Sequence, residues 1–178
     1  MPDSDYTLET ILDESTIRAG VESLAADIRS RCGDTPLIAI VLMDGAKPFA
    51  DLLLPQIPSI VETRYIKASS YQGTQSTGEV IIEGGAEPLP VGSSVLILDD
   101  VLDTGLTLQT ITHKFLEAGV AQVLSAVAIT KRGCQTTHYC ADFSAFELGN
   151  DFLVGFGMDY DGALRELPFV AKLQFVSE

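Results

Sequence analysis

Hydrophobic residues recur along this chain at two different spacings. Between residues 16 and 31 they return every three to four positions, which predicts an amphipathic helix. Its apolar positions are Ile17, Val21, Leu24, Ala25 and Ile28. Asp13 or Ser15 is placed to cap the start of this helix, and Gly33 to end it. Residues 37–43 are apolar without interruption, as in a strand buried on both faces of a parallel sheet.

Similar segments follow to the end of the chain. The pattern predicts helices at 47–54 and 106–118 and strands at 60–68, 78–82, 95–98, 123–130 and 152–158. Residues 84–92, rich in glycine and proline, read as a turn between two strands. Apolar strands that alternate with helices indicate an α/β fold with a largely parallel sheet. The length, 178 residues, suits one domain spanning 1–178.

Charge and composition exclude several classes of protein. The chain has 25 acidic and 11 basic residues, a net charge of −14, which disfavours a nucleic-acid surface. Its longest apolar run has seven residues, whereas a membrane span needs about 20. The acidic N-terminal stretch lacks the features of a signal peptide, so we expect a cytoplasmic protein that binds no membrane.

The cysteines give no metal site of a common type. There are three, Cys32, Cys134 and Cys140, an odd and sparse number that fits a reducing compartment. Cys134 and Cys140 flank His138, but a fourth ligand is missing and the spacing matches no common zinc pattern. We therefore favour ordinary structural roles for these side chains.

Three aspartates follow the apolar strand in the segment VLILDDVLDTGLTL, residues 95–108. In parallel sheets ligands bind beyond the carboxyl ends of strands, where Asp99, Asp100 and Asp103 are expected. Residues 104–107 lead into the next helix, whose N-terminal amides and dipole favour an anion. The segment predicts a phosphate site, although it is not a P-loop, because no GxxxxGK[ST] is present.

The paired carboxylates suit a phosphorylated sugar. Asp99 and Asp100 can accept hydrogen bonds from sugar hydroxyls, or reach Mg²⁺ through water. Asp103 stands between the pair and the phosphate turn, where it can face the reactive carbon of the sugar. The alternative is a strand end with helix-capping aspartates, which are common, but two aspartates followed by DTG and Thr107 are more specific.

This segment resembles the phosphoribosyl-diphosphate (PRPP) motif of the type I phosphoribosyltransferases, and most of all that of the hypoxanthine-guanine enzymes. Four other stretches agree in order and spacing over residues 15–170. They are VLMDGAKPFADLL (41–53, diphosphate loop), SSYQGTQSTGEV (69–80, mobile catalytic loop), AITKRG (128–133, purine-binding strand end) and NDFLVGFGMDYDGALRELP (150–168, purine lid and metal aspartate). The resemblance implies the type I fold, a mainly parallel central sheet flanked by helices with a small hood, and purine salvage.

The resemblance also implies a role for each matching residue. On the PRPP side, Asp99 and Asp100 would bind the ribose hydroxyls and, through water, Mg²⁺, and Asp159 would reach a second Mg²⁺. The 5′-phosphate would be held by Thr104, Gly105, Leu106 and Thr107, and the diphosphate by Met43, Asp44, Gly45 and Arg165. On the purine side, the implied residues are Asp103 as general acid or base, Lys131 as donor to O6, Phe152 as stacking ring, Leu153 as backbone contact, and Ser70 and Tyr71 as the closing loop.

Two positions depart from the family pattern. The diphosphate loop has Asp44 where a lysine or an asparagine is usual, and the nearest cation along the chain is Lys47. A carboxylate facing diphosphate is unfavourable unless Mg²⁺ intervenes or the side chain turns away. Asp99 stands where glutamate is common, which shortens the reach of that carboxylate.

Other functions stay open at this stage. A regulatory protein could keep the fold and sense PRPP or a nucleotide while binding nucleic acid, although the charge of −14 argues against it. A transferase for another base is the third alternative, but Lys131 is only a donor and favours an oxygen at purine position 6. The choice among hypoxanthine, guanine and xanthine stays open. The family usually forms homodimers or homotetramers, so we expect one of these assemblies.

Overall fold

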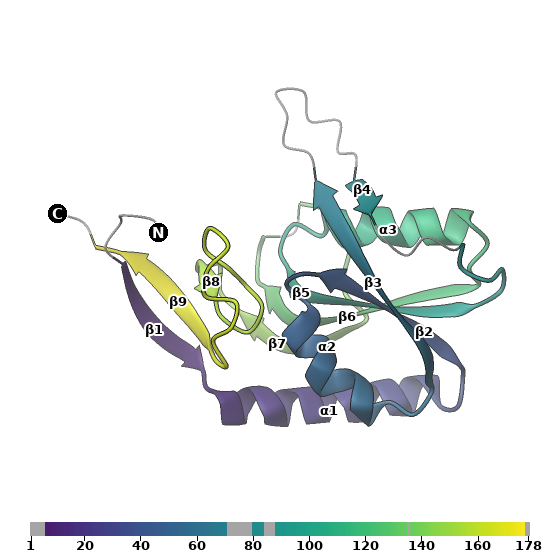
Figure 1. Cartoon of the computed structure of the whole chain (residues 1–178), viewed down its shortest axis with the longest axis horizontal. Helices are drawn as coiled ribbons and strands as arrows, with labels where there is room; N and C mark the ends of the chain where they lie inside the picture. The colour runs from purple at the N-terminus through teal and green to yellow at the C-terminus, as the bar shows by residue number, and fades with distance from the viewer. Residues whose placement is uncertain (1–5, 71–79, 84–87, 135, 177–178) are drawn as a thin grey trace.

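The fold is built around one six-stranded sheet. The computed structural model describes residues 6–70, 80–83, 88–134 and 136–176. The sheet has the strand order β4-β3-β2-β5-β6-β7, in which five strands are parallel and β4 is an antiparallel edge (Figure 1). In chain order the elements are β1 (Tyr6–Leu12), α1 (Glu14–Cys32), β2 (Leu37–Met43), α2 (Lys47–Leu53), the 3₁₀ turn η1 (Leu54–Gln56), β3 (Ile60–Ser70), β4 (Val80–Glu83), β5 (Ser94–Leu102), α3 (Leu106–Glu117), β6 (Gln122–Lys131), β7 (Phe143–Leu148), β8 (Leu153–Val154) and β9 (Val170–Phe175).

The expected α/β fold with a mainly parallel sheet is confirmed. The uninterrupted apolar segment forms the central strand β2, buried from Leu37 to Leu42. β5 has the same character but runs four residues past the predicted end at 98, because its pairing with β6 continues as far as Leu102. The aspartates Asp99 and Asp100 therefore lie on the last part of the strand rather than after it.

Helices cover both faces of the sheet. α1 buries the five predicted apolar positions, starts at Asp13, whose side chain accepts the amide of Thr16, and ends at Gly33. α1 and α2 lie against one face and α3 against the other (Figure 1). This arrangement follows from right-handed crossovers between parallel strands. From β2 the sheet grows in one direction to β3, and from β5 it grows in the opposite direction to β6, so the two connecting helices α2 and α3 lie on opposite faces.

A small second sheet joins the two ends of the chain. β1 and β9 pair antiparallel, with β8 beside β9, and this hood stands apart from the main sheet (Figure 1). The strand predicted at 152–158 is wrong beyond Val154. There the chain makes a tight turn, in which Gly155 and Met158 exchange backbone hydrogen bonds and Phe156 has a φ of 48°. A φ in this region ends an extended strand.

β4 is found at Val80–Glu83, close to the expected 78–82, whereas residues 84–87 of the expected turn lie outside the described part of the chain. None of the helices in the described part is long and apolar enough to cross a membrane.

Candidate functional site

Asp99 and Asp100 lie half-buried at the carboxyl end of β5, beside the loop that leaves β2. The loop passes so close that a side chain on Gly45 would place its Cβ 2.1 Å from Oδ2 of Asp100. A larger residue at position 45 would therefore force the carboxylate of Asp100 to move. The predicted diphosphate loop and the predicted ribose aspartates are therefore adjacent parts of one surface.

A hollow of about 220 Å³ opens at this surface. It is lined by Leu42, Met43, Asp44, Gly45, Ala68, Asp99, Asp100, Thr107 and Arg165. Arg165 comes from the distant segment after β8, where its guanidinium pairs with Asp159 at 2.7 Å and donates to the carbonyl of Gly157 at 2.7 Å. Seven of the predicted site residues thus converge on one hollow, with a cation fixed on its wall.

The electrostatics of the aspartate pair favour a partner that is cationic or rich in hydroxyl groups. Burial raises the pKa of Asp99 well above its ordinary value, and the charge of Asp100 raises it further. Burial also raises the pKa of Asp100, although hydrogen bonds from Asp99 and the backbone and the charge of Arg165 oppose this effect. A ligand that donates hydrogen bonds or positive charge would stabilise both ionised carboxylates.

The predicted phosphate turn forms a second, smaller hollow of about 70 Å³. Its lining residues are Asp99, Val101, Leu102, Asp103, Thr104, Gly105, Thr107 and Leu108, so that it shares Asp99 and Thr107 with the first hollow. Gly105 precedes α3 with a φ of 83°, and the exposed Leu106 starts the helix. Within the described part of the chain, the amide of Leu106 makes a long hydrogen bond, 3.4 Å, to the hydroxyl of Thr104 and no shorter one. An anion at this helix start would meet unpaired amides and the positive end of the dipole.

Asp103 lies next to a lysine from the neighbouring strand. Nζ of Lys131, at the end of β6, is 3.8 Å from Oδ2 of Asp103, and the lysine side chain is only 13% exposed. Cys134 lies near this pair of residues. Burial, and after it the negative charge of Asp103, raises the pKa of its thiol. The sequence predicted an ordinary structural role for Cys134 rather than a metal ligand, and it gave no sign that this cysteine lies beside Asp103.

Asp44 finds a cation that the sequence did not indicate. Lys47, the nearest basic residue along the chain, pairs with Asp51 instead, at 2.6 Å. The partner of Asp44 is Lys67 on β3, at 3.5 Å. Lys67 is the register partner of Met43 in the sheet, so only the pairing of β2 with β3 brings Lys67 to this loop. The Met43–Asp44 peptide bond is cis.

Comparison with known proteins gives the family. The family model described as the phosphoribosyl transferase domain matches residues 7–161. This chain belongs to the phosphoribosyltransferase family. It is 31% identical over 167 residues to the hypoxanthine-guanine phosphoribosyltransferase of Bacillus subtilis, an alignment that covers 93% of each chain. It is 32% identical to the enzyme of that name from Cricetulus griseus, covering 93% of this chain and 80% of the relative.

Solved structures agree with this family. The crystal structure of a hypoxanthine phosphoribosyltransferase from Staphylococcus aureus matches with a TM-score of 0.86 and 28% identity, covering 93% of this chain and 91% of that one. The type I phosphoribosyltransferase fold expected from the sequence, with its central sheet and hood, is thereby confirmed.

The predicted purine side of this phosphoribosyltransferase is more open. Phe152 is 48% exposed rather than part of the core, and its ring meets that of Tyr160 edge to face, with centroids 5.9 Å apart. Leu153 is buried. Neither Phe152 nor Leu153 lines either of the two hollows. Arg165, by contrast, lines the same hollow as Asp99 and Asp100.

Of the predicted closing residues Ser70 and Tyr71, the structure describes only the backbone of Ser70. Ser70 ends β3, but its side chain and the whole of Tyr71 lie outside the described residues, as does the rest of the loop to residue 79. Among the described residues, no three His, Cys, Asp or Glu side chains are arranged to hold a metal ion by themselves.

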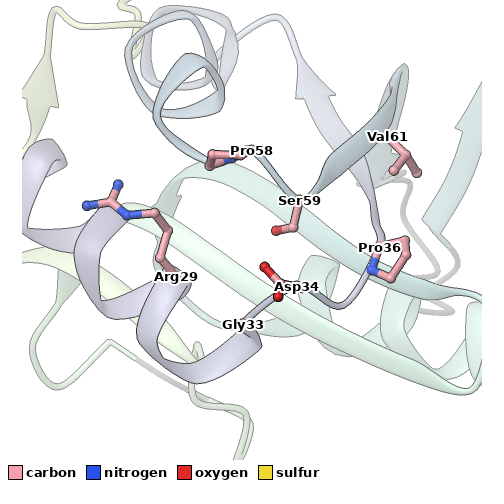
Figure 2. A pocket seen from close by; sticks show the side chains of 7 residues that line it. All are labelled: Arg29, Gly33, Asp34, Pro36, Pro58, Ser59 and Val61. Atoms are coloured by element: carbon pink, nitrogen blue, oxygen red, sulfur yellow. The ribbon is translucent and has the colours of Figure 1, made fainter.

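A larger hollow, about 370 Å³, lies at the opposite end of the sheet (Figure 2). Its lining includes Pro36, just before β2, and Ser59, just before β3, so it is at the amino ends of the strands. Arg29 on its wall already donates to the carbonyl of Gln56 at 2.8 Å. None of the predicted site residues lines this hollow, although it is larger than the two hollows that those residues line.

Proposed function

We propose that this phosphoribosyltransferase transfers the 5-phosphoribosyl group from PRPP to a 6-oxopurine, hypoxanthine or guanine, giving the nucleoside 5′-monophosphate and diphosphate. The observation that carries the proposal is the convergence of Asp99, Asp100, Arg165, the 43–45 loop and the 103–107 turn on two adjoining hollows. The curated relatives of this chain bear the name of that activity.

PRPP would lie across both hollows. The turn of residues 104–107 would hold its 5′-phosphate, mainly through the amides at the start of α3. Asp99 and Asp100 would accept hydrogen bonds from the two ribose hydroxyls, which suits a carboxylate pair that burial makes costly to ionise alone. Arg165 and the 43–45 loop would contact the diphosphate from the other side.

The aspartates also fit magnesium. Asp99, Asp100 and Asp159 would hold Mg²⁺ together with substrate oxygens and water, since Mg²⁺ usually keeps several waters and takes only one or two carboxylates from the protein. The carboxylate of Asp159 accepts a hydrogen bond from the amide of Gly162 and forms an ion pair with Arg165. These two contacts fix its orientation. When bound, the ion would offset the charge of the departing diphosphate.

The transfer breaks the bond between ribose C1′ and the diphosphate oxygen and forms a bond from C1′ to a purine ring nitrogen. Asp103 would share the proton of the purine at N7 as general acid or base. Lys131, 3.8 Å from Asp103, would donate to the exocyclic O6 and so reject an amino group there. Phe152 would stack on the purine, and the backbone of Leu153 would contact its edge. Ser70 and Tyr71 would close over the reaction and keep out water that would hydrolyse PRPP.

The regulatory alternative is not favoured by the relatives, which are named as enzymes. We propose that the protein acts as a homodimer or homotetramer without nucleic acid or membrane partners. Its mass, 19.1 kDa per chain, makes light scattering a direct test of the assembly. A monomer in that measurement would refute the proposed assembly.

A direct assay tests the reaction. Purified protein is mixed with PRPP and Mg²⁺, and hypoxanthine, guanine, xanthine and adenine are offered separately while nucleotide formation is followed by absorbance. We expect turnover with hypoxanthine or guanine, none with adenine, and none when EDTA removes the metal. Turnover with adenine alone would refute the assignment of Lys131, and no turnover with any base would refute the proposed function.

A further inference from the structure

The backbone carbonyl of Thr104, at the start of the phosphate turn, is held by an unusual number of donors. It accepts the amide of Thr136 at 3.1 Å, the amide of Thr137 at 3.3 Å and the hydroxyl of Thr137 at 3.1 Å. A carbonyl oxygen has two lone pairs, so three donors occupy it fully. All three come from the segment after β6, which lies more than 30 positions along the chain.

This arrangement fixes the direction of the next amide. Among the described residues the only cis peptide bond is Met43–Asp44, so the bond from Thr104 to Gly105 is trans. In a trans peptide the carbonyl and the following N–H point in opposite directions. Because the oxygen of Thr104 faces Thr137, the N–H of Gly105 points away from that segment. The same contact keeps a carbonyl oxygen, which would repel phosphate, turned away from the anion.

Thr137 also limits how far the turn can rotate. A Cβ on Gly105 would lie 2.5 Å from Oγ1 of Thr137, so the hydroxyl sits directly against the glycine. Gly105 has a φ of 83°, a conformation that leaves glycine free to rotate further unless a neighbour prevents it. Thr137 is such a neighbour.

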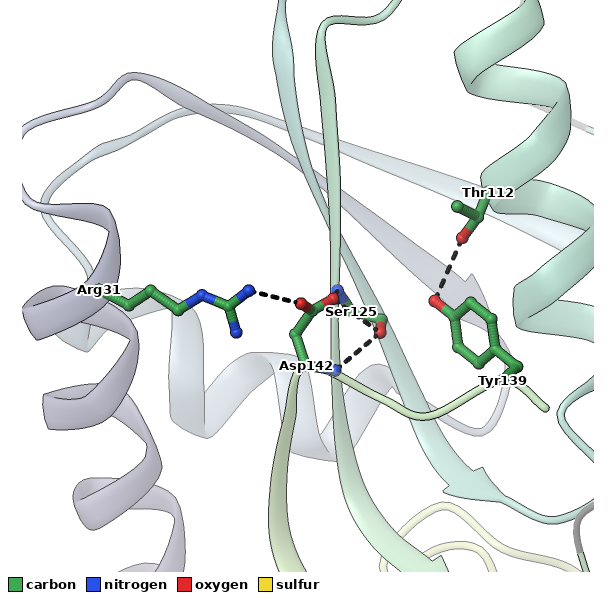
Figure 3. Close-up of polar contacts among 5 residues, drawn as sticks. All are labelled: Arg31, Thr112, Ser125, Tyr139 and Asp142. Carbon is green, nitrogen blue, oxygen red and sulfur yellow. Dashed lines mark hydrogen bonds and ion pairs between the residues drawn. The ribbon is translucent and has the colours of Figure 1, made fainter.

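The segment that carries Thr137 is itself fastened to the fold. The hydroxyl of Thr137 accepts the amide of Tyr139 at 3.3 Å, and the hydroxyl of Tyr139 meets that of Thr112 on α3 at 3.1 Å. Further on, Asp142 accepts the amide of Ser125 on β6 at 3.0 Å and pairs with Arg31 on α1 at 2.8 Å (Figure 3). Thr137 therefore connects a fixed segment to the turn that is proposed to bind phosphate.

We propose that Thr137 is a positioning residue for the 5′-phosphate: it holds the carbonyl of Thr104 outward so that the amides of the 104–107 turn stay directed at the anion. This inference rests on the proposed function, because it takes the 104–107 turn as the phosphate site. Thr137 does not touch the substrate. Its effect is on the affinity for the phosphate group, not on the chemical step.

The test compares three variants. Thr137→Val keeps the shape of the side chain but removes the hydroxyl, and Thr137→Ser keeps the hydroxyl. Thr136→Val changes a neighbour whose hydrogen bond to Thr104 comes from its backbone amide, which the substitution keeps. For Thr137→Val we expect the KM for PRPP and the dissociation constant of ribose 5-phosphate, measured by calorimetry, to rise about three- to tenfold, the effect of one hydrogen bond. kcat and the KM for the purine stay unchanged, and the other two variants behave as wild type.

The outcomes separate this inference from the proposed function. A Thr137→Val protein with a lower melting temperature but unchanged affinity for PRPP and ribose 5-phosphate would show a merely structural role and overturn the inference. So would an equal loss of affinity in Thr136→Val. If the wild-type protein converts no 6-oxopurine, the proposed function fails, while ribose 5-phosphate binding to the same variants still decides the role of Thr137.

Discussion

Lys67→Met is the most informative single substitution, because Lys67 offsets a carboxylate placed where the family has none. Asp44 lines the hollow proposed for diphosphate, and its Oδ2 lies 3.5 Å from Nζ of Lys67. Without the ammonium group, the negative charge of Asp44 would repel the incoming diphosphate. The KM for PRPP should therefore rise, with little change in kcat or in the KM for the purine.

The size of the effect follows from the distance and the exposure. The side chains of Lys67 and Asp44 are 63% and 52% exposed, so water screens both. Two unit charges about 4 Å apart in water interact by about 1 kcal/mol, which is about fivefold in affinity. Diphosphate carries several charges, so we expect a rise in KM of about fivefold or more. Exposed ion pairs stabilise a fold by roughly 0.2–1 kcal/mol, so the melting temperature should change little.

The assay varies PRPP at a saturating concentration of hypoxanthine or guanine. Lys47→Met is the matched control, because it removes the same charge from a lysine that pairs with Asp51 rather than Asp44. Asp44→Asn combined with Lys67→Met removes both charges and should restore the KM for PRPP. An unchanged KM in Lys67→Met, or no recovery in the double variant, would refute the reasoning.

Three further substitutions probe the rest of the site. Asp103→Asn should lower kcat by about 10²–10⁴-fold while PRPP binding persists; equal turnover would remove Asp103 from the mechanism. Lys131→Ala should weaken use of hypoxanthine relative to PRPP by about 10- to 100-fold, as for a lost charged donor, and unchanged purine selectivity would contradict its role. Burial raises the pKa of Asp99, so the ligand-free protein should lose stability as pH rises through that pKa. Asp99→Asn should therefore raise the urea midpoint at pH 7 yet weaken PRPP binding, and an unchanged midpoint would contradict this account.

The parts of the fold that could be predicted are those whose burial is complete. β2 is buried along almost its whole length, and α1 buries one continuous stripe, so each leaves a clear pattern in the sequence. β1 buries only Leu12 fully and exposes most of its other residues, so its sequence has no regular alternation. It becomes a strand because β9, from the other end of the chain, pairs with it. A pairing between the two ends of the chain leaves no signal in the local sequence of either strand.

The residues of the candidate site also fall into two groups, those with a local signal in the sequence and those placed by tertiary contacts alone. Asp99, Asp100 and Asp103 are close together in the sequence, and a strand end followed by a glycine and a helix start is a local signal. Lys67 and Thr137 reach the site through the register of β3 against β2 and through the segment after β6, respectively. Both are ordinary polar residues in the sequence, and only the tertiary structure gives them a partner.

The cations at this site offset only part of the repulsion that a polyanionic substrate would meet on a chain with a net charge of −14. Each is held by a carboxylate: Arg165 by Asp159 at 2.7 Å, Lys67 by Asp44 at 3.5 Å and Lys131 by Asp103 at 3.8 Å. These pairs orient the cations but cancel much of their charge, so they cannot by themselves balance PRPP. If the proposed function holds, backbone amides at the start of α3 and a divalent cation would supply the remaining attraction. Removing magnesium should consequently weaken the affinity for PRPP more than the loss of any one of these three side chains.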